Sequence, residues 1–259
     1  MAISDRILIP LVTPFTDDTT TISEVRLARS VQWHINQGAA GFVVGSEAGE
    51  FASISLSERK QLLEWVIRDS GALPVYVNVT AMTTASAVDL CQHAARHGAR
   101  GGVVAPPFVG TFSEAELGGH LTAIRRHGNL PTGYVDPSER TQHLAEQAST
   151  TGVLDPVKPL PEEIAYRSAP RPGTYEFFTS DGLALGVGVF GARRATRIVE
   201  EWPRVATTVQ GLFKLAGPAR IGKRVLELAE IEIGGHRGPM ASLDANGSQV
   251  LEKLLESLS

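Results

Sequence analysis

Only one cysteine, Cys91, is present in the 259 residues, so the chain cannot form an internal disulfide. Cys91 lies among apolar residues at helical spacing, and we interpret it as a buried thiol because free cysteine is usually interior. Long hydrophobic runs are also lacking, since no segment approaches the roughly 18 apolar residues that a membrane-spanning helix needs. Residues 1–15 contain an acidic residue and prolines in place of the basic and apolar regions of a secretion signal. We therefore expect a cytoplasmic protein.

An excess of basic residues is lacking too: 24 Lys and Arg stand against 28 Asp and Glu, for a net charge of -4. A protein without a basic field attracts neither nucleic acid nor anionic membranes, so we expect neither as a partner. We expect a small-molecule substrate instead. With 42% hydrophobic residues, the composition is that of a globular protein, and one α/β barrel routinely reaches this length. We therefore expect a single domain over residues 1–259.

The seven histidines form no recognisable metal motif. His93 and His97 have the i, i+4 spacing of two ligands on one helix, but the H-E-x-x-H pattern is absent and the sequence shows no third ligand nearby. We therefore expect no metal and no other cofactor.

Short β-branched runs alternate with helical segments along the first half, which is typical of parallel strands joined by helices. Four such units precede residue 128 and extrapolate to eight, so we predict a (β/α)8 barrel. An open doubly wound sheet is the alternative, but no G-x-G-x-x-G follows the first strand. The predicted strands are residues 6–12, 41–45, 74–80 and 101–105, and the predicted helices are residues 24–37, a helix that begins after Ser55 or Ser57, 84–97 and 113–127.

The second half is less regular. We expect strand five within residues 132–136, strand six near 152–154, strand seven at 175–178 and strand eight around 195–199. Repeated prolines in residues 155–173 predict a shortened sixth helix, because proline lacks an amide donor and clashes with the preceding turn. C-terminal helices are expected at residues 205–215, 221–231 and 249–258.

Several motifs lie at the ends of predicted strands, where a barrel of parallel strands builds its active site. LVTPF (residues 11–15) begins within strand one, strand two ends in GSEAGE (45–50), and TGVLD (151–155) lies at strand six. LPTGYVDPSERT (130–141) lies at strand five, and further segments follow in order. In these motifs and their order, the chain resembles the dihydrodipicolinate synthase and N-acetylneuraminate lyase family.

The resemblance implies a class I aldolase barrel, in which a strand-six lysine forms an imine with pyruvate or a related 2-oxo acid. Leu154 stands at the lysine position, where it packs in the barrel or lines the substrate pocket, and it cannot attack a carbonyl. Lys158 is the nearby substitute, although its proline-rich setting favours a solvated lysine. We predict a lyase or aldolase-type enzyme repurposed for a small carboxylate or carbonyl substrate. The alternative is a non-catalytic barrel that binds a metabolite or a protein partner.

The resemblance also assigns residues around the substrate. Ser46 retains the first hydroxyl of the family's Thr pair, and Glu47 replaces the second, as a general base or as a charge that points out of the loop. Tyr134 matches the family's proton-relay tyrosine if a gap precedes Arg140, whereas an ungapped match puts Val135 there. Arg140 matches the carboxylate-binding arginine under either alignment.

Asp181 falls where the family has S-G-D-D, which predicts a substrate contact. Arg194, like Arg197, lies near small residues of the family's strand eight, where it narrows the pocket, binds an anionic ligand or points outward. Phe108 and Val109 stand where the family has two tyrosines, one of which a subunit lends to its neighbour. An apolar contact at this place is compatible with the family's homodimer or homotetramer.

Overall fold

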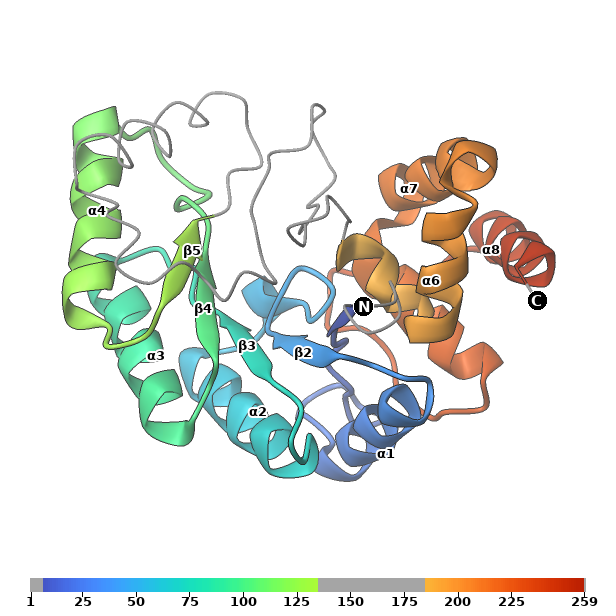
Figure 1. Cartoon of the computed structure of the whole chain (residues 1–259), viewed down its shortest axis with the longest axis horizontal. Coiled ribbons are helices and arrows are strands. Elements are labelled where there is room, and N and C mark those ends of the chain that lie inside the picture. Colours follow the sequence, from blue (N-terminus) through green and yellow to red (C-terminus); the bar gives the residue numbers. More distant parts are fainter. Residues whose placement is uncertain (1–6, 135–184, 259) are drawn as a thin grey trace. The chain divides into compact units, whose positions relative to one another are not determined.

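The computed structural model describes residues 7–134 and 185–258 (Figure 1). The chain forms two compact units, one from Met1–Val75 with Leu185–Ser259, and one from Tyr76–Ala184. In both units parallel strands alternate with helices, as the sequence predicts for the first half of the chain.

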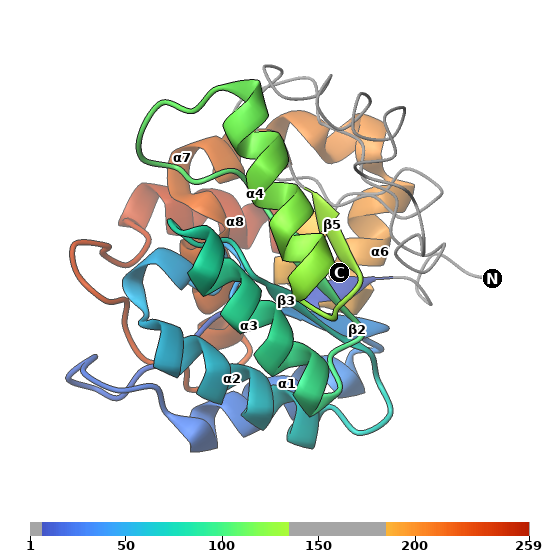
Figure 2. The ribbon, with the colours of Figure 1, turned by 90° about the vertical axis from the view of Figure 1, so that its left-hand side faces the viewer.

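The first unit begins with strands β1 (Leu8–Pro10) and β2 (Gly41–Val44), which pair in parallel. Every residue of both strands is buried, as expected for strands covered on both faces. Helix α1 (Glu24–Asn36) connects them, and η2 (Phe51–Ser53) and helix α2 (Leu56–Asp69) follow β2. The helices α1 and α2 lie side by side (Figure 2).

The first turn of α2 is fixed by a capping box. Ser55 Oγ accepts a hydrogen bond from Glu58 N at 3.2 Å, and the Glu58 carboxylate accepts one from Ser55 N at 2.8 Å. These bonds satisfy backbone donors that have no partner inside the helix. The predicted Ser55–Glu58 spacing is therefore confirmed, with Leu56 as the first helical residue.

The second unit contains strands β3 (Val75–Asn78), which begins at the unit boundary, β4 (Gly101–Val104) and β5 (Thr132–Tyr134), paired in parallel in that order. Helices α3 (Thr84–His97) and α4 (Glu114–His127) lie side by side (Figure 2). Cys91 on α3 is buried, and burial raises the pKa of its thiol to about 11. The prediction of a buried thiol is confirmed.

The C-terminal part of the first unit consists of η3 (Leu185–Phe190), α6 (Ala192–Glu200), α7 (Trp202–Leu228) and α8 (Ala245–Ser257). η3 packs against β1 so closely that a side chain on Gly188 would place its Cβ 2.4 Å from the carbonyl oxygen of Leu8. Helix α7 is interrupted at Gly217, with φ 72°, and Pro218 follows. The break separates the two helices predicted for residues 205–215 and 221–231.

The strand predicted around residues 195–199 is wrong, because these residues belong to α6. Ala192, Ala195 and Ile198 are buried at a spacing of three, which places them on one helical face, while Arg193 and Arg197 are exposed. Helical periodicity therefore decides the structure here. The predicted strands six and seven and the shortened sixth helix lie outside the described residues.

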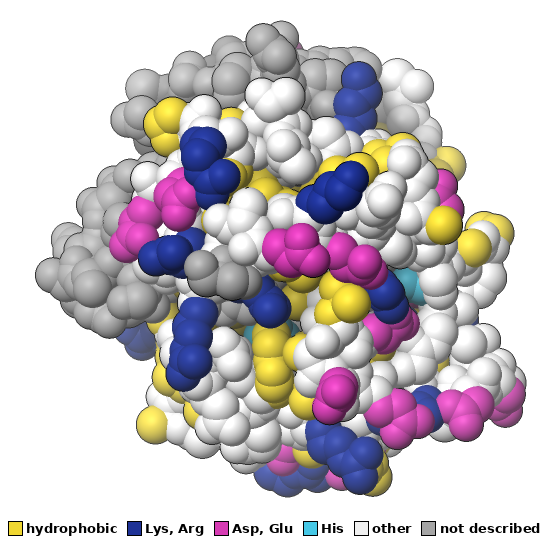
Figure 3. Space-filling view, turned by 90° about the vertical axis from the view of Figure 1, so that its right-hand side faces the viewer, with side chains coloured by type: hydrophobic (Ala, Val, Ile, Leu, Met, Phe, Trp, Pro, Cys, Tyr) yellow, Lys and Arg dark blue, Asp and Glu magenta, His cyan; other side chains and the backbone are white. Residues whose placement is uncertain are grey.

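The described surface carries mixed charge. On the face shown in Figure 3, Lys and Arg side chains alternate with Asp and Glu, and hydrophobic side chains are scattered among them. Among the helices in the described ranges, not one combines the length and the apolar character needed to cross a membrane.

His34 on α1 is a buried polar residue of the first unit, 2% exposed. Within the described part of the chain, neither its Nδ1 nor the buried Ser30 Oγ one turn earlier has a hydrogen-bond partner. Burial lowers the pKa of His34 to about 3, because the charged imidazolium loses its hydration.

This shift makes stability depend on pH. The unfolded chain takes up a proton on His34 near pH 6.5 and the folded chain only at about 3, so acidification through this window favours unfolding. We predict that His34→Leu removes about 2 kcal/mol of the difference between the unfolding free energies at pH 7 and pH 5. Urea titrations at both values measure it. His127→Gln, at an exposed histidine, should keep the full difference, and an unchanged difference in His34→Leu would refute the assignment.

Candidate active site

Residues 45–50, which follow β2, carry two of the predicted site residues, Ser46 and Glu47. They lie at the C-terminal end of a parallel strand, where barrels place their chemistry. Gly45 turns the chain there with φ 66°, a conformation that favours glycine. Thr13, which follows β1, donates its Oγ1 hydrogen to the carbonyl oxygen of Gly49 at 2.6 Å. The strand ends of β1 and β2 are thereby joined.

Ser46 presents a buried hydroxyl that has no hydrogen-bond partner among residues 7–134 and 185–258. Its side chain is 6% exposed, and its Oγ makes no hydrogen bond within the described part of the chain. A buried polar group left unsatisfied costs about 1–3 kcal/mol, which favours a partner for this hydroxyl beyond the described residues, such as a bound ligand. The Ser46 hydroxyl is available to a ligand as both donor and acceptor.

Glu47 is accessible to solvent, yet desolvation raises the pKa of its carboxyl to about 7. Water reaches the exposed part of the side chain, while the surrounding protein removes part of the hydration of the carboxyl. The direction of the shift follows from this loss of hydration, which disfavours the charged form. A carboxyl that titrates near neutral pH is suited to give and take protons.

Arg59, in the first turn of α2, is a nearby cation that the sequence reasoning missed. It is buried, and its Nε lies 3.9 Å from the position that a Cβ on Gly45 would occupy. The guanidinium carbon lies 5.4 Å from the centroid of the Phe51 ring. Burial lowers the pKa of Arg59 to about 10, which leaves it charged at neutral pH. Its place on the apolar face of α2, with Leu62, Leu63 and Val66, was the available signal.

Glu50 closes the loop and is held by residues from the C-terminal part. Its Oε1 lies 2.9 Å from Lys223 Nζ and 2.8 Å from His236 Nδ1, and all three side chains are buried. Burial alone would raise the pKa of Glu50, but the hydrogen bond from His236 and the charge of Lys223 lower it below its ordinary value. Burial lowers the pKa of Lys223 against the opposing effect of Glu50. No local pattern in the sequence marks Lys223 and His236 as partners of Glu50.

Ser46 and Glu47 are consecutive residues that directly follow Gly45 at the C-terminal end of β2, and their assignment to the site stays a prediction. Tyr134 is the last residue of β5, at the C-terminal strand end. Arg194 was expected on strand eight but lies half-buried on α6, and burial lowers the pKa of its guanidinium. The other predicted residues lie outside the described ranges: Arg140, Leu154, Lys158 and Asp181.

Phe108 and Val109, between β4 and α4, have exposed side chains (59% and 64%). Apolar side chains at this place agree with the surface that the sequence predicts for contact between subunits. The oligomeric state stays a prediction.

Comparison with known proteins gives consistent results. The model of the Dihydrodipicolinate synthetase family matches residues 3–150. A 4-hydroxy-tetrahydrodipicolinate synthase of Methanococcoides burtonii is 24% identical over 286 residues, covering 97% of each chain. The same enzyme of Methylobacterium radiotolerans is 28% identical over 214 residues, covering 78% of this chain and 71% of that one. The solved structure of Proteus mirabilis N-acetylneuraminate lyase superposes with a TM-score of 0.74 at 16% identity, covering 98% of both chains.

The structural similarity shows the fold, a (β/α)8 barrel, to which the described residues contribute the parallel strands β1 to β5. The fold class expected from the sequence is confirmed.

The raised pKa of Glu47 has a consequence for stability. The stability linked to this group is fully present below pH 4.5 and is lost as the pH rises through about 7, because the folded chain holds the proton more tightly. We predict that Glu47→Gln unfolds at a higher urea concentration than the unaltered protein at pH 8, and that the gap narrows at pH 5. Glu200→Gln, at an exposed glutamate of α6, should show no such gap. Equal stability of Glu47→Gln and the unaltered protein at pH 8 would contradict the assignment.

Proposed function

Because the chain belongs to the dihydrodipicolinate synthetase family, we propose that it is a lyase or aldolase-type enzyme acting on a small carboxylate or carbonyl compound. The observation that carries the proposal is the pair formed by Ser46 and Glu47 at the end of β2. One offers a buried hydroxyl without a partner in the described structure, and the other a carboxyl with a pKa near 7. Aldol chemistry needs a proton-transfer group together with donors or a cation that stabilise the enolate.

The charge and the hydrogen-bond donors around this loop indicate the class of substrate. Ser46 Oγ can donate a hydrogen bond to a carboxylate or carbonyl oxygen, and Arg59 adds a buried positive charge beside the same loop. A hydrogen bond to a charged group contributes about 1.5–3 kcal/mol. These groups favour a small anion such as a 2-oxo acid over a neutral or cationic ligand.

Glu47 is assigned the proton transfers. In aldol cleavage it removes the proton of the hydroxyl beside the breaking carbon–carbon bond, whose electrons pass to the carbon next to the 2-oxo group. The protonated Glu47 then returns the proton to that carbon. A pKa of about 7 leaves both forms populated at neutral pH, so each step finds the form that it needs.

The proposal does not use a lysine imine. This part rests on the sequence, in which Leu154 stands where the resemblance places the lysine. Hydrogen bonding to the enolate oxygen, with the charge of Arg59 nearby, supplies the electrostatic stabilisation instead.

Binding can be tested without knowing the turnover. We predict that pyruvate or another small 2-oxo acid raises the melting temperature, because a ligand that binds the folded state stabilises it. The Ser46→Ala variant should bind the 2-oxo acid about tenfold more weakly, because a lost binding free energy of about 1.4 kcal/mol corresponds to a factor of ten. Its stability without ligand should be undiminished, because the substitution removes a buried hydroxyl that is unsatisfied in the described structure. Ser242→Ala, at an exposed serine, is the control. If no 2-oxo acid in a panel raises the melting temperature, the proposed substrate class is wrong.

The absence of an imine has its own test. Incubation with pyruvate and borohydride traps an imine as a stable secondary amine, which intact-mass analysis detects. We predict no adduct on this chain, while a family member with the strand-six lysine is labelled stoichiometrically. An adduct that maps to Lys158 or to any other lysine would restore the usual aldolase mechanism with a relocated nucleophile.

A further inference from the structure

We propose that Lys223, His236 and Arg237 are positioning residues that act through Glu50 to set Ser46 and Glu47 for the ligand. The inference rests on the proposed function, since it concerns the same site. It assigns a role in that site to the C-terminal part of the chain, from α7 to the segment that follows it.

The backbone of Glu50 has an unusual conformation. This residue has φ 55°, a left-handed conformation that residues other than glycine rarely adopt. Such a conformation persists only where the surroundings hold it. Here the surroundings are the contacts of its fully buried carboxylate.

The contacts of the Glu50 carboxylate come from the C-terminal part of the chain. Oε1 of Glu50 meets Lys223 Nζ at 2.9 Å and His236 Nδ1 at 2.8 Å, and Oε2 accepts a hydrogen bond from Arg237 N at 3.3 Å. Lys223 also donates to the carbonyl oxygen of Gly235. Three residues near the C-terminus thus hold one carboxylate of the β2–α2 loop.

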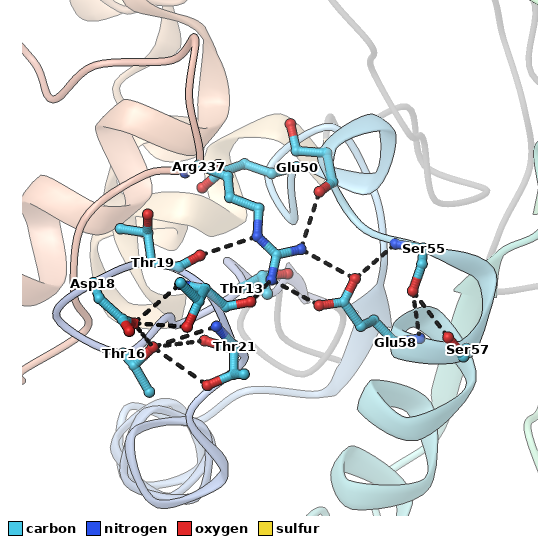
Figure 4. A network of polar contacts seen from close by, with 12 residues as sticks. Thr13, Thr16, Asp18, Thr19, Thr21, Glu50, Ser55, Ser57, Glu58 and Arg237 are labelled. Carbon is cyan, nitrogen blue, oxygen red and sulfur yellow. Dashed lines mark hydrogen bonds and ion pairs between the residues drawn. The ribbon is translucent and has the colours of Figure 1, made fainter.

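The segment that carries His236 and Arg237 is also bound to the loop between β1 and α1 and to the start of α2. The guanidinium of Arg237 binds the Glu58 carboxylate at 2.7 and 3.0 Å and the carbonyl oxygens of Thr19, Thr20 and Ser53 at 3.0, 2.6 and 3.1 Å. Figure 4 shows it between the β1–α1 loop and the start of α2. Its guanidinium carbon also lies 4.7 Å from the Phe15 ring centroid. The C-terminal segment is therefore a fixed support for Glu50.

Backbone hydrogen bonds connect the segment that ends at Glu50 to the two site residues. The backbone N of Glu50 donates to the carbonyl oxygen of Glu47 at 3.0 Å, and that of Gly49 donates to the carbonyl oxygen of Ser46 at 3.0 Å. The first bond joins Glu50 to Glu47, and the second joins its neighbour Gly49 to Ser46. A displacement of the Glu50 carboxylate therefore moves Ser46 and Glu47 with it.

The experiment replaces His236. An asparagine amide nitrogen falls near the position of Nδ1, the atom that meets Glu50, whereas a glutamine amide falls near Nε2. We expect His236→Asn to retain the function of the site and His236→Gln and His236→Leu to lose it. The readouts are the titration of Glu47, followed by NMR of ¹³C-labelled glutamate carboxyls and assigned with Glu47→Gln, and the dissociation constant for pyruvate.

In the unaltered protein and in His236→Asn, Glu47 should titrate at about 7. In His236→Gln the midpoint should fall toward the ordinary value of 4.5 and pyruvate should bind about tenfold more weakly. Arg224→Met is the matched control, because Arg224 adjoins Lys223 on α7 but pairs with Glu227 and Glu252.

An unaltered Glu47 titration in folded His236→Gln would overturn the proposal and leave the cluster a structural role alone. If His236→Leu does not fold, the comparison of the two amide variants still decides. If pyruvate does not bind the unaltered protein, the proposed function fails, but the Glu47 titration tests the positioning role independently.

Discussion

The buried carboxylate of Glu50 is the constraint on which the site region depends. A charge removed from water is tolerated only when partners compensate for its lost hydration, and Lys223 and His236 do so within 3 Å. Because the partners of Glu50 belong to the C-terminal segment, that segment lies against the loops that follow β1 and β2. The same segment places Arg237 on Glu58, so the capping box of α2 is joined to the cluster. The contacts of Glu50 and Arg237 thus join the loops that follow β1 and β2 to the C-terminal segment.

Glu47 and Glu50 are two glutamates three residues apart whose different surroundings shift their pKa values in opposite directions. Glu50 is bound by Lys223, His236 and the backbone N of Arg237 and has a pKa below its ordinary value, whereas Glu47 is exposed and only partly desolvated, with a pKa of about 7. Two carboxyls whose pKa values are pushed apart can take different tasks. On this account Glu50 holds the loop as a permanent anion, and Glu47 exchanges protons. The fold supplies both environments from one six-residue loop.

The sequence predicted what local patterns encode. Residues 84–97 were predicted as a helix and form α3 with the same bounds, and Ser55 caps the start of α2 as its spacing with Glu58 indicated. The resemblance led to Ser46 and Glu47, but it favoured a strand at residues 195–199, where the spacing of Ala192, Ala195 and Ile198 produces α6. The partners of Glu50 could not be predicted, because Lys223 and His236 lie more than 170 positions away and no local pattern marks them. Only the folded chain brings them to one carboxylate.

A crystal structure of the protein grown with pyruvate near pH 7 tests the central claim most directly, because it locates the ligand without any assumption about turnover. We expect an intact, non-covalent pyruvate with an oxygen within hydrogen-bond distance of Ser46 Oγ and with the Glu47 carboxyl beside it. Glu50 should still be bound by Lys223 and His236. Density that joins pyruvate to a lysine, or pyruvate bound away from residues 45–50, would contradict it.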